Sequence, residues 1–408
     1  MGALGVGAND GSREPRATLV SAPDELQSIA ELAREHGAIG LDTEFMREKT
    51  YRARLCLAQI AAGDQIWLID PLAEADLQPI ADLVADPEVE VVVHAGKQDL
   101  EIFYEYHGVV PRRVFDVQLA AAFAGHGASL PYGRLVEETT GVSLTKGESY
   151  TDWCRRPLSD SQLRYAADDV RYLVPAADRL RAELEELGRI DWVAEEMIAL
   201  EDESAYRFTP EDAWKRVGGR GTLKPKQLTI LRELATWREE AAARRDLPRG
   251  WVMKDATLIE LARRGPSSTH DLGNVRGLNA KEAERSGRQI LAAIARGREA
   301  EPMERLPAPS RQIQTRARMV SGLADAIVRA RAEDAQLATE LVATRGELEA
   351  LLAAVFNGQV DADRHRLLQG WRRVIAGDAV MALATGQVAV RVTDRPPFIE
   401  EVGVTDGN

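Results

Sequence analysis

The chain has 408 residues, of which 45% are hydrophobic and 29% charged, and its 52 basic and 65 acidic side chains give a net charge of −13. This composition excludes wholesale disorder, and the length allows two to four domains. No apolar run approaches the roughly 18 residues of a membrane-spanning helix, and the first residues lack the basic-then-apolar order of a secretory signal and are expected to form a loose tail.

The first half of the chain has the pattern of an α/β domain. Short apolar runs predict four strands, at 38–45, 55–61, 65–70 and 89–93. After the last of these, apolar residues recur at helical spacing to about residue 190. Several strands followed by many helices predict a mixed sheet with helices, in a domain that we place at 16–210.

The second half of the chain is predicted to be helical. Apolar residues at helical spacing, interrupted by glycines, indicate an all-α bundle at 211–300. A stretch with three prolines, 301–310, is typical of a linker. Another helical set follows it, within a second helical domain placed at 301–408 whose end is expected to fray from about residue 395.

The net charge differs between these three segments. Residues 1–210 carry 20 basic and 38 acidic side chains, residues 211–300 carry 19 and 12, and residues 301–408 carry 13 and 15. An acidic chain would usually disfavour a nucleic-acid partner, but the basic middle segment has the right sign for a phosphate backbone. A solvated protein surface would give the same basic run, so the charge alone leaves both interpretations open.

The chain contains only two cysteines, Cys56 and Cys154. Two cysteines cannot form a disulfide framework or a multi-thiolate zinc site. Neither has the sequence context of a nucleophile, so we expect two core thiols in a protein of the reducing cytoplasm.

Two acidic residues end the first predicted strand, in the sequence LDTEF. Asp42 and Glu44 are two positions apart, so their carboxylates project to the same side of the strand. Carboxylates held together repel each other and favour a proton or a hard divalent cation between them. A polar strand exit is the alternative interpretation of this short pattern.

A third acid follows the strand at 89–93. Asp99 falls in the first turn of a predicted helix that begins near Lys97, where an acid also simply complements the helix dipole.

A fourth acid lies on a later predicted helix, in the sequence YAADDVRYL. Tyr165 and Asp169 are four positions apart and share one face, whereas Asp168 points away from them, toward solvent, Arg164 or Arg171.

The order of these pieces is that of the tyrosine-bearing DEDD exonucleases. Four carboxylates can hold two divalent metal ions about 3.5–4 Å apart. One ion would activate a water as the nucleophile, the other would stabilise the leaving 3′-oxygen, and the tyrosine hydroxyl would orient the attacking water.

Longer motifs resemble the ribonuclease D family of bacterial 3′→5′ exoribonucleases over nearly the full length. They include LDTEFMREKTYRARLCLAQIA, WLIDPL, HAGKQDLEIF, FDVQLAAAFAGHG and VSLTKGESYTDWCRRPLSDSQLRYAADDVRYLVP. The resemblance implies a ribonuclease H-like exonuclease domain, metal ligands at Asp42, Glu44, Asp99 and Asp169, and a water-orienting Tyr165. Lys97 and Gln98 depart from the residues that relatives often have there, and Lys97 is a candidate phosphate contact.

The helical half resembles HRDC domains, the modules shared by ribonuclease D and RecQ-type helicases, with a best match over 222–300 and a diverged second copy over 312–388. The basic residues of the first copy are candidates to bind phosphates. Trp237 and Trp371 are expected in the core, and Trp251 is a candidate stacking surface. The candidate phosphate contacts are Lys224, Lys226, Arg244, Arg245, Arg249, Lys254, Arg263 and Arg264.

The resemblance implies an enzyme with two Mg²⁺ or Mn²⁺ ions that trims the 3′ trailers of tRNA precursors and releases 5′-monophosphates. We expect it in the cytoplasm, and as a monomer, because the sequence has no coiled-coil heptads or repeat array. Two alternatives remain at this point. The same four acids serve DNA 3′→5′ exonucleases, and the contacts that distinguish RNA from DNA cannot be deduced from the sequence. A non-catalytic RNA-binding protein is the second alternative.

Overall fold

A computed structural model describes residues 16–22, 24–73, 76–144, 151–303 and 309–404. The chain forms two compact units: Met1–Phe45 with Leu55–Glu201, and Met46–Arg54 with Asp202–Asn408. Half of the predicted linker, at 304–308, and residues 145–150 of the last family motif lie outside the described residues.

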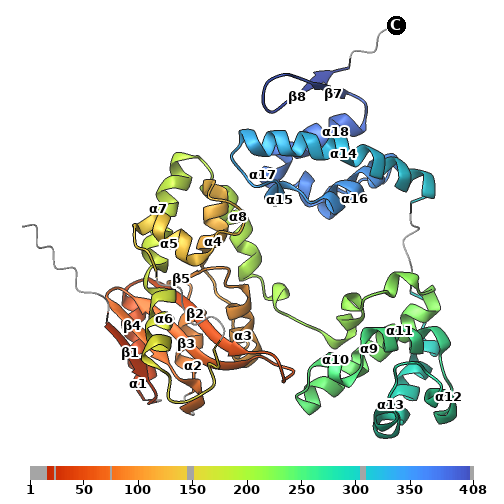
Figure 1. The fold of residues 1–408 in the computed structure, drawn as a ribbon, viewed down its shortest axis with the longest axis horizontal. Helices are drawn as coiled ribbons and strands as arrows, with labels where there is room; N and C mark the ends of the chain where they lie inside the picture. The colour runs from red at the N-terminus through yellow and green to blue at the C-terminus, as the bar shows by residue number, and fades with distance from the viewer. Residues whose placement is uncertain (1–15, 23, 74–75, 145–150, 304–308, 405–408) are drawn as a thin grey trace, which may run out of the picture. The chain divides into compact units, whose positions relative to one another are not determined.

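The first unit is built on a six-stranded sheet with the order β1-β4-β3-β2-β5-β6 (Figure 1). The mixed sheet was predicted, but only four of its strands were, and β1 and β6 were missed. β4 pairs antiparallel with β3 and parallel with β1, and the pairs β2–β5 and β5–β6 are parallel. The tail predicted before residue 20 is wrong in its last part, because residues 16–20 form an edge strand. The strands are β1 Arg16–Val20, β2 Ala38–Met46, β3 Arg54–Ala62, β4 Gln65–Ile69, β5 Glu90–Val93 and β6 Val114–Asp116.

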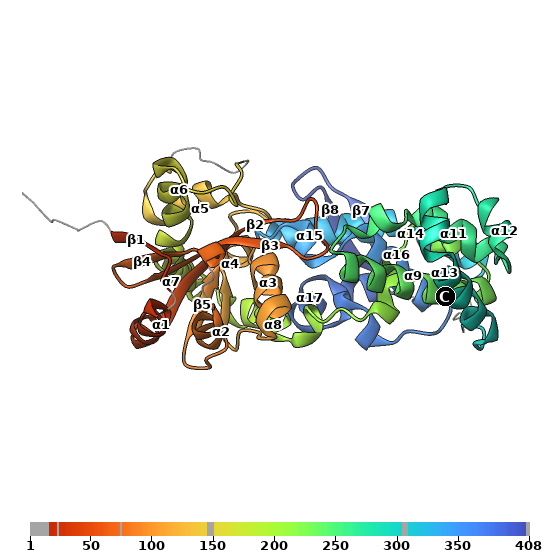
Figure 2. The ribbon, with the colours of Figure 1, turned by 90° about the horizontal axis from the view of Figure 1, so that it is seen from below.

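Helices lie on both sides of this sheet (Figure 2). The helix that carries Tyr165 and Asp169, α6, begins with a capping box in which the Ser159 side chain accepts from the Gln162 backbone N–H. It packs against β4 and β1. The helices are α1 Glu25–Glu35, α2 Gln78–Val84, α3 Lys97–His107, α4 Val117–Ala124, α5 Tyr132–Thr140, α6 Asp160–Arg171, α7 Leu173–Glu186 and α8 Ile190–Glu201, with a short 3-10 turn at Pro71–Ala73.

Gly40 of β2 lets the end of α6 approach the sheet closely. A Cβ atom at this position would lie 2.8 Å from the Val170 carbonyl oxygen and 3.2 Å from the Leu173 Cβ. We expect Gly40→Ala to lower the free energy of unfolding by about 1–3 kcal/mol. It should also shift the end of α6, the helix that carries Asp169. Denaturant titration measures the loss of stability.

Gly133→Ala provides the matched control for this substitution. Gly133 lies in α5, and no atom lies within 4 Å of the Cβ that alanine would add. Alanine should stabilise that helix by about 0.5–1 kcal/mol, because glycine loses more backbone freedom on folding. Equal effects of the two substitutions would contradict the proposed clash at Gly40.

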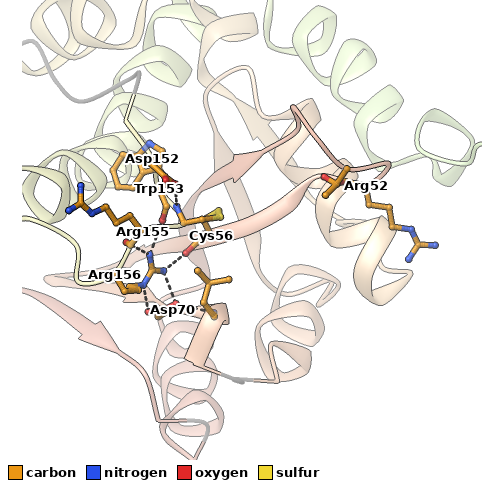
Figure 3. The surroundings of a disulfide bond; sticks show 10 residues. Arg52, Cys56, Asp70, Asp152, Trp153, Arg155 and Arg156 are labelled. Atoms are coloured by element: carbon orange, nitrogen blue, oxygen red, sulfur yellow. Dashed lines mark hydrogen bonds and ion pairs between the residues drawn. A yellow bond between two sulfur atoms is a disulfide. The ribbon is translucent and has the colours of Figure 1, made fainter. Parts of the chain in front are cut away.

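A disulfide joins Cys56 of β3 to Cys154, so the expectation of two separate thiols is wrong (Figure 3). The Cα atoms lie 5.0 Å apart although the residues are 98 positions apart in the sequence. The Arg156 guanidinium secures the same segment, donating to the Cys56 carbonyl at 2.6 Å and to Asp70 Oδ1 at 2.7 Å. The segment leading into α6 is therefore attached to the sheet twice.

Reduction of this disulfide is expected to lower the free energy of unfolding by about 2–4 kcal/mol, because it releases a long closed loop in the unfolded chain. Denaturant titrations with and without a dithiol reductant measure the difference. The Cys56→Ser/Cys154→Ser protein is the control and should not respond to the reductant. Equal stability of the native protein in both conditions would contradict a stabilising bond.

The first helical part of the second unit packs around a continuous apolar core that includes Trp237, which is 4% exposed. As predicted, it is all-helical over its described residues. Its helices are α9 Pro225–Arg245, α10 Arg249–Val252, α11 Asp255–Arg264, α12 Thr269–Gly273 and α13 Ala280–Glu299, with 3-10 turns at Glu203–Ala205, Pro210–Arg216 and Arg220–Thr222.

The second helical part ends in a β-hairpin, which the sequence did not predict. β7 Val388–Val392 and β8 Ile399–Gly403 pair antiparallel, so this part is not all-α, and β8 lies where the chain was expected to fray. None of the described helices is long and apolar enough to cross a membrane. The helices are α14 Arg311–Asp334, α15 Thr339–Val342, α16 Arg345–Phe356, α17 Gly370–Arg372 and α18 Asp378–Ala384, with 3-10 turns at Ala362–Arg364 and Arg366–Leu368 and a π turn at Arg373–Gly377.

Candidate metal and active site

Three of the predicted acids meet in one pocket of the first unit. Asp42 and Glu44 project from β2 and Asp169 from α6, and one carboxylate oxygen of each lies within 4.8 Å of the others. The two-residue spacing on the strand accounts for the first pair, and the packing of α6 on the sheet brings in the third. The pocket has a volume of about 240 Å³ and is lined by Asp42, Thr43, Glu44, His94, Tyr132, Tyr165 and Asp169.

Asp99, from the first turn of α3, is buried beside this cluster and accepts a hydrogen bond from the Thr43 hydroxyl. The turn before α3 is held by the buried Asp116, which accepts from the backbone N–H groups of Ala95 at 3.0 Å and Gly96 at 3.2 Å. Ala95 has a φ of 54°. Asp116 also caps α4, so one carboxylate fixes the junction that places Asp99.

Burial raises the pKa values of all four acids, and the charges of neighbouring acids add to this effect. Burial, followed by the charges of Asp99, Asp169 and Glu44, raises the pKa of Asp42 well above its usual value. The pKa of Glu44 rises to about 8, chiefly by burial and then by Asp169. Burial is also the largest cause that raises the pKa of Asp99 to about 6 and of Asp169 to about 7.

The acid cluster fits a divalent cation. Among the described residues, no lysine, arginine or histidine forms an ion pair with any of the four acids, although all are partly or fully buried. Oxygen-rich, negatively charged sites without a protein counter-ion are the sites that Mg²⁺ and Mn²⁺ occupy. The carboxylates of Asp42, Glu44 and Asp169 are therefore suited to hold a divalent cation.

Tyr165 shares this pocket and lies beside Trp153, with 5.9 Å between the ring centroids. Asp168, the acid next to Asp169, instead pairs with Arg171 at 2.9 Å. The helical spacing predicted both placements: Tyr165 and Asp169 face the pocket, and the intervening acid is directed to a basic partner.

The basic residues predicted to bind RNA lie in different environments. Lys97 is exposed at the start of α3. Arg245 donates to Glu282 at 3.0 Å and Arg249 pairs with Glu239 at 3.2 Å, and both carboxylates are buried, so these arginines also stabilise the fold.

The other candidates are more exposed. Lys226 donates to the Ala300 carbonyl at 2.8 Å and Arg244 lies 3.8 Å from Glu240. Lys224 and Lys254 are exposed at the starts of α9 and α11. Lys254 and Trp251, which is 63% exposed, line one cavity of about 680 Å³, whereas Trp371 is buried as predicted.

The sequence analysis missed three residues of the pocket: Thr43, His94 and Tyr132. Thr43 lies between the two acids of LDTEF, and His94 begins the HAGKQDLEIF motif, so proximity to the acids was a usable signal for both. Tyr132 lies 33 positions before Tyr165, and nothing in the local sequence connects it with the acids.

Residues 17–185 match the family model of the 3′-5′ exonuclease, and residues 227–294 match that of the HRDC domain. Ribonuclease D of Granulibacter bethesdensis is 39% identical over 93% of this chain and 96% of its own length. Ribonuclease D of Nitrobacter hamburgensis is 37% identical over 92% and 97%. The crystal structure of Escherichia coli RNase D, an exoribonuclease involved in structured RNA processing, superposes with a TM-score of 0.78 and 32% identity, covering 91% of this chain and 99% of that one.

Proposed function

The chain belongs to the ribonuclease D family and is a 3′-5′ exoribonuclease, and we propose that Asp42, Glu44, Asp99 and Asp169 hold the two divalent cations it uses. The observation that carries this proposal is the cluster of partly buried carboxylates with raised pKa values, which pair with no basic side chain among the described residues. Such a cluster costs folding free energy by itself, and bound cations offset that cost.

The acids and Tyr165 of this pocket have separate roles in hydrolysis. Bound divalent cations supply an activated nucleophile and stabilise the charge on the leaving 3′-oxygen. The four acids hold and orient the cations, and the Tyr165 hydroxyl orients the attacking water. The products are 5′-monophosphates, released one at a time from the 3′ end.

The substrates proposed for this pocket are tRNA precursors with 3′ trailers, and the cations are Mg²⁺ or Mn²⁺. The basic residues of the first helical domain would bind the phosphates of the RNA body, with Lys97 near the catalytic pocket. Lys224 and Lys254 are exposed, whereas Arg245 and Arg249 already pair with Glu282 and Glu239 and would bind RNA only with their remaining donors. We place the protein in the cytoplasm, as a monomer.

A tRNA precursor with a short 3′ trailer tests this proposal. In the presence of Mg²⁺, the trailer should shorten one nucleotide at a time and digestion should stop at the mature end, as read at nucleotide resolution. A DNA oligomer of the same sequence is the matched substrate. Faster loss of the DNA would contradict the substrate class, and products of random length would contradict the direction.

A further inference from the structure

His94 lines the catalytic pocket but has no part in the cation site described above. We propose that the His94 imidazole accepts a hydrogen bond from the ribose 2′-hydroxyl of the 3′-terminal nucleotide and thereby selects RNA over DNA. This inference rests on the proposed function, because it places the terminal nucleotide in the same pocket.

The hydrogen bonds of the imidazole leave one acceptor for a ligand. Nε2 of His94 lies 3.0 Å from the Leu130 carbonyl oxygen. A carbonyl only accepts, so Nε2 carries the proton, and in the neutral ring Nδ1 is then an acceptor. No group in the described part of the chain donates to Nδ1. A donor from the substrate would complete its hydrogen bonding.

The ring of Tyr132 fixes the orientation of this imidazole. The two ring centroids lie 5.4 Å apart with an interplanar angle of 62°, an edge-to-face contact. The Tyr132 hydroxyl donates to the Asp168 carbonyl at 3.0 Å, which attaches the tyrosine to α6 next to Asp169. His94 is thus held on two sides, by Leu130 and by Tyr132, and its free acceptor is preorganised relative to the acids.

The other polar side chains of the pocket wall are assigned to other contacts. His94 is therefore the side chain that remains to bind the ribose. The carboxylates of Asp42, Glu44 and Asp169 are assigned to cations, and the Thr43 hydroxyl already donates to Asp99. In its neutral form, the His94 ring offers a side-chain acceptor in the same wall. The 2′-hydroxyl is a donor that RNA has and DNA lacks, and it is the group by which proteins distinguish the two.

Two RNA oligomers that differ only in the 2′-hydroxyl of the terminal nucleotide test the proposal. We expect the wild-type protein to cleave the ribo-terminated oligomer with a kcat/KM about 5- to 10-fold above that of the deoxy-terminated one. His94→Phe keeps a ring against Tyr132 but has no acceptor. It should lower kcat/KM for the ribo-terminated oligomer and leave kcat/KM for the deoxy-terminated oligomer nearly unchanged. The ratio of the two kcat/KM values should therefore approach one.

His94→Asn is the conservative variant, because its amide oxygen lies close to the position of Nδ1, and it should retain part of the preference. If His94→Phe slows both oligomers equally, the histidine is only structural and the proposal is overturned. A wild-type protein with no preference between the oligomers would overturn it as well. Retained hydrolysis by Asp42→Asn would be a separate result, and it would contradict the proposed function itself.

Discussion

Asp169→Asn is expected to lower the rate of RNA hydrolysis by at least about 10³-fold, which corresponds to about 4 kcal/mol of transition-state stabilisation. The substitution keeps the size of the side chain but removes one of the three carboxylates whose oxygens lie within 4.8 Å of one another. The cations would lose a ligand, whereas the helix that carries it remains. Single-turnover digestion of an oligoribonucleotide with saturating Mg²⁺ measures the effect.

Asp168→Asn is the matched control, since it makes the same chemical change one position earlier on the same helix. Asp168 pairs with Arg171, so its loss should change hydrolysis only slightly. RNA binding, measured by anisotropy, should survive in both variants. Comparable turnover by Asp169→Asn and Asp168→Asn would refute the cation site and would favour the alternative of a non-catalytic RNA-binding protein.

The parts of the site that local periodicity controls could be predicted from the sequence. Side chains two positions apart on a strand share a face, which places Asp42 and Glu44 together. Side chains four positions apart on a helix also share a face, which places Tyr165 and Asp169 together. Both rules act within one element and need no knowledge of the fold. The order of these pieces along the chain then indicated the DEDD arrangement.

The parts that depend on the packing of distant segments could not be predicted in this way. Cys56 and Cys154 lie 98 positions apart, and only the position of β3 beside the segment before α6 brings them together. Tyr132 reaches the pocket because its hydroxyl bonds to the backbone of α6. The hairpin of β7 and β8 was missed because both strands are short and neither has a buried residue, so neither has a strong apolar pattern.

Removal of divalent cations is expected to destabilise the protein more at about pH 8 than at about pH 5. The acids of the pocket have folded-state pKa values above the usual ones: about 6 for Asp99, about 7 for Asp169 and about 8 for Glu44. The folded protein therefore binds more protons than the unfolded chain between about pH 4 and pH 8, so its stability without cations falls as the pH rises through that range. Cations replace these protons and should cancel the fall.

Thermal unfolding in EDTA and in excess Mg²⁺, across this pH range, measures the difference. At a cation concentration of about 100 Kd, one bound ion stabilises by about 2.7 kcal/mol, so the increase in Tm should be clear near pH 8 and small near pH 5. In the Asp42→Asn/Asp169→Asn protein, the cation response should largely disappear, and the stability in EDTA should exceed that of the wild type near pH 8. A cation effect that is the same at every pH, or undiminished in this variant, would mean that Mg²⁺ stabilises the protein at some other place than the four carboxylates.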